Sequence, residues 1–181
     1  MKKFLALILA ALMMVTMFAA CSDEADVEEA IEKFFEDNVN ELIEQSENLE
    51  VDAHLVTYLS DEEDKKVQEY INERFGEMLK SVADSISYEI IEVEVSGDAA
   101  TATIKSRGKV YSSLWIIELS GYTEEVREEW GYSETDAYSD IDITMEILEE
   151  AFDRLEASIE VKEAEKEIEL EKEDGEWVVK K

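Results

Sequence analysis

Apolar residues recur every three or four positions in three stretches of the chain, and this spacing predicts amphipathic helices. The predicted helices cover residues 25–46, 61–84 and 141–159. Ser60 and Glu63 have the spacing of a capping box, which supports a helix start near residue 61. Ser139 or Asp140 is the expected N-cap of the last helix.

A fourth stretch, residues 109–131, fits two structures. The residues at helical spacing are Trp115, Leu119, Tyr122, Val126 and Trp130. A strand would instead run through Leu114, Ile116 and Ile117, and Gly121 costs a helix about 1 kcal/mol relative to alanine. We expect this stretch to be mainly a helix.

Two other stretches alternate apolar and polar residues and predict β-hairpins. Gly97-Asp98 is the expected turn of the first hairpin, so that Ser96 pairs with Ala99. This register places Val95 opposite Ala100, Val93 opposite Ala102, and Ile91 opposite Ile104. All six apolar side chains then share one face.

The second hairpin closes the sequence. Asp174-Gly175 is a strong signal for a type I′ turn, which pairs Glu173 with Glu176. The register then places Leu170 opposite Val179, Glu169 opposite Lys180, and Lys172 opposite Trp177.

Two separate hairpins would have too little core, so we expect them to join into one antiparallel sheet. The predicted fold is therefore α+β, with N-terminal helices and a central helix packed on a curved antiparallel sheet built from two hairpins.

The first 21 residues follow a different pattern. Lys2 and Lys3 precede an apolar run from Phe4, and small residues then lead to Cys21, the single cysteine of the sequence. This order is typical of a secretory signal. The alternative is an uncleaved anchor, but the 17 residues from Phe4 to Ala20 are near the lower limit of a membrane span, and acidic residues follow them.

The segment Met17-Phe18-Ala19-Ala20-Cys21 resembles the lipobox of bacterial lipoproteins, although Phe18 stands where that family usually has Leu. The resemblance implies cleavage after Ala20, lipid on the Cys21 thiol, and attachment by acyl chains to the extracytoplasmic face of the cell membrane. The expected organisation is a signal peptide over 1–20, a lipidated tether over 21–26 and a single domain over 27–181.

The Gly97-Asp98 hairpin and the closing segment Glu167–Val179 resemble small Gram-positive lipoproteins with NTF2-like or cystatin-like domains. That family is largely without an assigned function. The resemblance therefore implies a fold, and Cys21 is the single functional residue that it carries over.

Charge narrows the possible partners. Without the leader, 15 of the 17 Lys and Arg remain against 48 Asp and Glu, a formal charge of −33. Such a charge repels nucleic acid and anionic headgroups. We expect diffuse, low-affinity binding of divalent cations, and a protein or small molecule of the cell envelope as the ligand.

Few residues of the sequence are candidates for catalysis, metal binding or anion binding. His54, the single histidine, has no nucleophile near it in the sequence, and a lipidated Cys21 leaves no zinc site of nitrogen and sulfur ligands. Lys105, Arg107 and Lys109 alternate and form the one basic cluster, with Lys105 predicted opposite Ile90 and Arg107 opposite Tyr88. They form either an anion-binding site or charged protection of a sheet edge.

No catalytic, cofactor or metal-binding residue is predicted. We therefore expect a lipid-anchored binding or interaction domain without catalytic activity. The alternative is an enzyme with a pocket between helices and sheet that uses a carboxylate, a tyrosine or His54.

Overall fold

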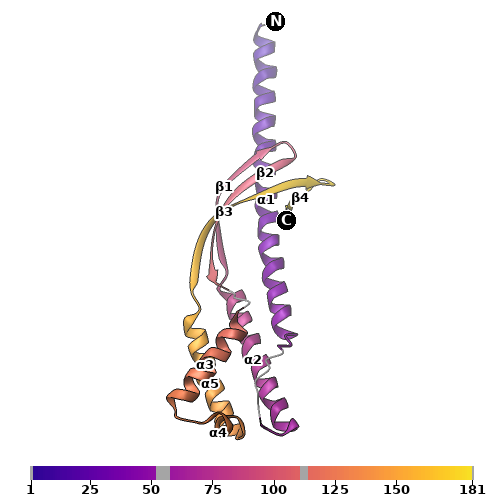
Figure 1. Cartoon of the computed structure of the whole chain (residues 1–181). Coiled ribbons are helices and arrows are strands. Elements are labelled where there is room, and N and C mark those ends of the chain that lie inside the picture. The colour runs from indigo at the N-terminus through magenta and orange to yellow at the C-terminus, as the bar shows by residue number, and fades with distance from the viewer. Residues whose placement is uncertain (1, 52–57, 111–113, 181) are drawn as a thin grey trace. The chain divides into compact units, whose positions relative to one another are not determined.

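The computed structural model describes residues 2–51, 58–110 and 114–180, with side chains described from Asp23 onward. The helices within these ranges are α1 (Lys2–Glu47), α2 (Asp61–Ser85), α3 (Trp115–Glu129), α4 (Glu134–Tyr138) and α5 (Ile141–Ser158) (Figure 1). The strands are β1 (Ser87–Ser96), β2 (Ala99–Lys109), β3 (Val161–Glu173) and β4 (Glu176–Val179). The protein is therefore α+β, as the sequence predicts.

The chain divides into two compact units. The sheet unit comprises Met1–Asn38, Ser87–Arg107 and Glu163–Lys181, and the helical unit comprises Val39–Ile86 and Gly108–Lys162. The helical unit thus consists of one segment that precedes β1 and one that lies mainly between β2 and β3. The domain bounds expected from the sequence, with one domain over residues 27–181, stay predictions.

The sheet unit contains a four-stranded antiparallel sheet in the order β1-β2-β3-β4. Ser96 pairs with Ala99, and Glu173 pairs with Glu176, so the register predicted next to both turns is confirmed. The Lys172 N–H donates to the Asp98 carbonyl at 2.9 Å, which connects β3 to the first turn. The expectation that the hairpins join into one sheet is therefore also confirmed.

The closing turn has the geometry that its sequence predicts. Asp174 has φ of 51° and Gly175 has φ of 92°. A type I′ turn requires positive φ at both central residues, and Asp-Gly tolerates this better than most pairs.

A β-bulge in β1 overturns part of the predicted register. Ile90, not Ile91, lies opposite Ile104, because the register shifts between Ile90 and Glu92. Ile91 is 50% exposed, whereas Ile90 packs against the apolar cluster of the sheet. A bulge adds one residue to a strand, so side-chain alternation does not continue across it.

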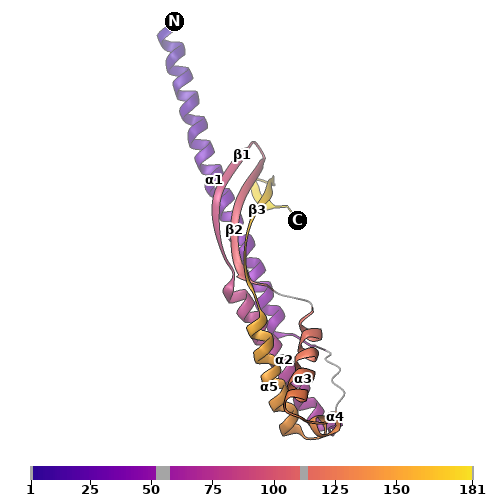
Figure 2. The same ribbon diagram turned by 60° about the vertical axis from the view of Figure 1, so that its left-hand side comes forward.

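One face of the sheet packs against α1. Val27 and Ile31, one helical turn apart on α1, are fully buried there. The other buried members of this cluster are Ala100, Ala102, Ile104, Leu170 and Trp177. Beside them Phe35 stacks on Tyr88 with ring centroids 4.1 Å apart. This part of α1 lies next to the strands in both views (Figures 1 and 2).

The helical unit has an apolar core of its own, where the sequence predicts one core between helices and sheet. Its helices α2, α3 and α5 lie side by side (Figure 2). The buried residues of α5 are Thr144, Ile147, Leu148, Ala151, Phe152 and Leu155. These residues cover a broad face of α5, because α5 contacts α2, α3 and α4.

In the ambiguous stretch 109–131, the helix α3 covers Trp115–Glu129, so the prediction of a mainly helical stretch is confirmed for the residues from 114 onward. Trp115, Leu119 and Val126 are buried on one side of α3, whereas Ile116 and Ile117 are exposed. Asp140 is the N-cap of α5, and its side chain accepts from the N–H groups of the next turn.

Candidate functional site

Cys21 lies within α1, and its side chain is outside the described part of the chain. Residues 21–26, the predicted tether, also lie within α1. Asp23 forms an ion pair with Lys172 of β3, with Lys172 Nζ 2.9 Å from Asp23 Oδ1. The helix is thus bound to the sheet two residues after Cys21.

A cavity of about 400 Å³ lies between α1 and the closing hairpin, and we call it the Trp177 pocket. Its lining residues are Asp26, Glu29, Ala30 and Lys33 of α1 and Gly175, Glu176 and Trp177 of the hairpin. The four α1 residues share one helical face because their spacing is three, four and seven. The type I′ turn brings the hairpin residues to that face.

The side chain of Trp177 forms the apolar wall of the pocket and is only 7% exposed. Lys172 Nζ lies 5.2 Å from the centre of the indole ring, a cation–π contact. The hydrogen bond to Asp23 raises the pKa of Lys172, and the charges of Asp23, Asp26 and Asp98 raise it further. Lys172 therefore stays positively charged next to Trp177 at neutral pH.

Trp177 Nε1 is buried and has no hydrogen-bond partner among the described residues. Buried polar groups are usually paired, because leaving one unpaired costs about 1–3 kcal/mol. The indole N–H is thus a buried donor without an acceptor among the described residues.

The charged residues of the Trp177 pocket are exposed. They are Asp26, Glu29, Lys33 and Glu176. Enzymes usually place their acid–base groups in desolvated surroundings, which these side chains do not have. Three carboxylates beside an aromatic wall suit a ligand with a positively charged group. In the described ranges, no group of three or more His, Cys, Asp or Glu side chains could hold a metal ion.

Lys105 does not lie opposite Ile90 as predicted. The bulge in β1 places it opposite Glu89. Its Nζ lies 2.9 Å from Glu163 Oε1, and this hydrogen bond raises the pKa of Lys105. Lys105 is therefore already paired with a carboxylate of the neighbouring strand.

Arg107 lies opposite Ser87 rather than Tyr88, which corrects the second predicted partner for the same reason. It is exposed, and it belongs with Lys105 to the sheet unit. Lys109 belongs to the helical unit, where its Nζ donates to Ser81 Oγ at 2.5 Å.

A smaller cavity, of about 240 Å³, lies in the helical unit beside Lys109 and Arg74. Arg74 Nη2 lies 3.0 Å from Glu156 and 3.3 Å from Asp153, and Arg74 Nη1 lies 3.6 Å from Glu77. These three carboxylates already neutralise the guanidinium, so the cavity is a weak candidate for an anion.

The sequence places Trp177 opposite Lys172 in the closing hairpin, but it does not predict the pocket beside Trp177. Asp26, Glu29 and Lys33 lie among many other charged residues of α1, and their spacing shows only that they share a face. This face of α1 contacts the closing turn, which lies far from α1 in the sequence. Local sequence patterns therefore do not reveal the contact. His54 lies outside the described residues.

No protein-family model, curated protein or solved structure matches this chain. Among the residues that the structure describes, no helix is both long enough and apolar enough to cross a membrane.

Proposed function

We propose that this chain is a lipid-anchored binding or interaction domain on the extracytoplasmic face of the cell membrane, without catalytic activity. The proposal rests on the path of α1, which continues from Cys21 into the sheet unit. Asp26, the first residue of the Trp177 pocket, follows Cys21 by five residues, or about 8 Å along a helix. Lipid on Cys21 would therefore hold this pocket close to the membrane surface.

The exposed carboxylates of the Trp177 pocket support binding rather than catalysis. Together with the aromatic wall they favour a ligand that carries an amine or guanidinium group. A small molecule of the envelope or a Lys or Arg side chain of a protein partner meets this condition.

The finer fold that we propose is the cystatin-like or NTF2-like one. In the sheet unit a helix precedes an antiparallel sheet whose strands neighbour each other in sequence order. The helix packs on one face of that sheet through Val27 and Ile31. This arrangement supports the resemblance to small lipoproteins with such domains.

Cys21→Ser is expected to release the protein into the medium or to stall its processing. Stable attachment usually requires two acyl chains, and the variant has no thiol to carry them. The measurement is fractionation of cells into membrane and medium, with the mature N-terminus determined by mass spectrometry. Ser22→Ala, which keeps the thiol, is the matched control and should stay with the membrane. A Cys21→Ser protein that remains on the membrane and is cleaved after Ala20 contradicts the lipid anchor.

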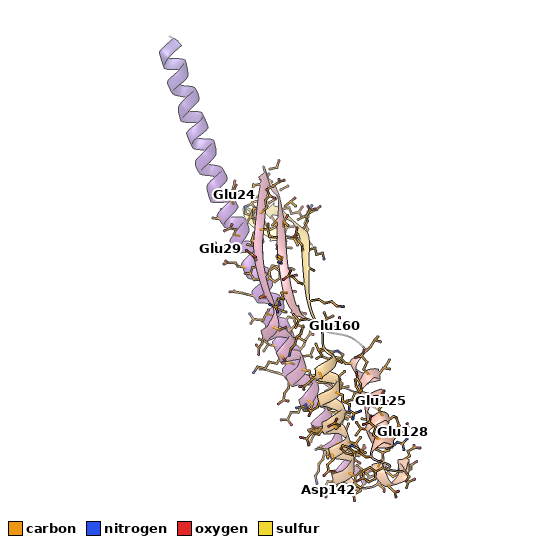
Figure 3. All side chains as sticks on the ribbon, turned by 90° about the vertical axis from the view of Figure 1, so that its left-hand side faces the viewer. Glu24, Glu29, Glu125, Glu128, Asp142 and Glu160 are labelled. Atoms are coloured by element: carbon orange, nitrogen blue, oxygen red, sulfur yellow. The ribbon has the colours of Figure 1, made fainter. Side chains whose placement is uncertain are left out.

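Divalent cations are expected to stabilise the fold without occupying one specific site. The acids are spread over both units, as Glu24 and Glu29 on α1 and Glu125 and Glu128 on α3 illustrate (Figure 3). Their repulsion acts over distances up to about one Debye length, which is about 8 Å at physiological salt, and added cations weaken it. Calcium and magnesium should therefore raise Tm equally, with weak, unsaturated heats in calorimetry. A stoichiometric calcium site of micromolar affinity would refute this picture.

A further inference from the structure

The longest strand of the sheet has one edge that is mostly uncovered. β3 runs from Val161 to Glu173, whereas β4 pairs only with its end, from Leu170 to Glu173 (Figure 1). One further hydrogen bond, from the Lys180 N–H to the Glu169 carbonyl at 2.9 Å, extends this pairing. Before Glu169, no described strand lies on that side of β3.

The direction of the backbone groups follows from the hydrogen bonds on either side. Ala164 and Lys172, both even-numbered, bond toward β2, through the Ala164 carbonyl and the Lys172 N–H. Glu169, which is odd-numbered, bonds toward β4. Because both polar groups of a residue in an antiparallel strand point to the same side, the odd residues face away from β2.

Glu163, Glu165 and Glu167 therefore present N–H and C=O groups to the open side, and we call these three residues the β3 edge. All three are exposed, as are Ala164 and Lys166 between them. An exposed edge of this length is a template for an additional strand.

We propose that the β3 edge binds an extended segment of a partner protein that carries Lys or Arg at alternate positions. The segment adds a strand to the sheet through backbone hydrogen bonds. Its basic side chains then lie directly across from Glu163, Glu165 and Glu167, of which Glu163 already pairs with Lys105. Opposite charges across a strand pair are favourable. The net charge of the protein accelerates the approach of such a segment.

Charge also argues against a second copy of this chain as the occupant. Two β3 edges paired antiparallel and centred on Glu165 would place glutamate directly opposite glutamate at every position of the edge. Like charges directly opposite each other are destabilising. Pairing between two β3 edges is therefore unfavourable, whereas pairing with a basic strand is favourable.

The test uses a fluorescent nine-residue peptide of alternating Lys and Val and the full chain in detergent micelles. We expect saturable binding in fluorescence anisotropy and slower hydrogen exchange of the Glu163, Glu165 and Glu167 amides by NMR. A peptide with the same composition, N-methylated on the residues that would pair, separates backbone pairing from simple charge attraction. Equal binding of both peptides, or no protection of these three amides, overturns the proposal.

Two variants of Glu165 distinguish the contribution of backbone hydrogen bonds to peptide binding from that of the carboxylate charge. Glu165→Pro removes an N–H that faces the open edge and leaves the β2 side of the strand paired, so it should weaken peptide binding about tenfold or more. Glu165→Gln keeps the N–H and should weaken binding only severalfold. Equal affinities of wild type and Glu165→Pro would contradict strand addition, as would concentration-dependent dimers through β3. If Glu165→Pro does not fold, the proposal is tested by the wild type alone, through the protection of the Glu163, Glu165 and Glu167 amides when the peptide binds.

These measurements do not depend on the lipid anchor, because micelles hold the chain in solution whether or not Cys21 is acylated. Failure of the strand proposal therefore leaves the Cys21→Ser result unaffected.

Discussion

Trp177→Ala is expected to destabilise the protein by about 3–5 kcal/mol, the usual cost of truncating a buried aromatic side chain. Trp177 packs in one cluster with Val27 and Ile31 of α1 and Leu170 of β3. Its removal leaves a cavity at the junction of helix and hairpin. Because the total stability of a domain is only about 5–15 kcal/mol, the loss should be apparent in both thermal and urea unfolding followed by circular dichroism.

Trp130→Ala is the matched control. Trp130 lies at the end of α3 and is 43% exposed, so its truncation should change the free energy of unfolding by about 0.5 kcal/mol or less. Trp177→Phe is a second comparison, because it keeps an aromatic ring and removes the unpaired N–H. Its loss should be much smaller than that of the alanine variant. Equal melting temperatures for Trp177→Ala and Trp130→Ala would contradict the position of Trp177 in the core.

The two hairpin turns show what could be predicted from the sequence. Gly97-Asp98 and Asp174-Gly175 are dipeptides with strong backbone preferences, and a two-residue turn determines the pairing of its neighbours. The register is therefore correct from Ser96 back to Glu92, and throughout the closing hairpin. Local chemistry determines these features, so a single sequence suffices.

The register prediction fails at the bulge in β1. Ile90 and Ile91 are adjacent and equally apolar, so alternation does not decide which one faces the core. The choice depends on the contacts that each position meets in the folded sheet. Ile90 joins the cluster that includes Tyr88 and Phe35, whereas Ile91 points to solvent. The predicted partners of Lys105 and Arg107 were wrong for this one reason.

The sequence does not predict that the protein has two separate cores, and the reason is related. A buried stripe shows that a helix has a partner but not whether that partner is a sheet or another helix. The stripes of α1 and α5 look alike in sequence, yet α1 packs on the sheet and α5 packs against helices. The Trp177 pocket depends on the same long-range information, since it joins α1 to the closing hairpin.

Phe152→Ala is expected to be as damaging in the helical unit as Trp177→Ala is in the sheet unit. Phe152 is fully buried on α5, and its ring lies 5.2 Å from that of Phe75 and 6.0 Å from that of Tyr70. The Arg74 guanidinium lies 5.5 Å from the centre of the same ring. Truncation should therefore cost about 3–5 kcal/mol, because the cavity lies between packed helices that cannot readily close it.

Phe152→Leu is the matched control, since it nearly fills the same space and should cost about 1.5 kcal/mol or less. Hydrogen exchange then assigns each loss to a unit. Phe152→Ala should accelerate exchange most at helical-unit amides such as Ile71 and Leu155, which belong to the same core. Trp177→Ala should instead accelerate it most at Ile31 and Leu170. If either variant accelerates exchange equally in both sets, the two cores unfold together, and the separate contributions argued for Phe152 and Trp177 are wrong.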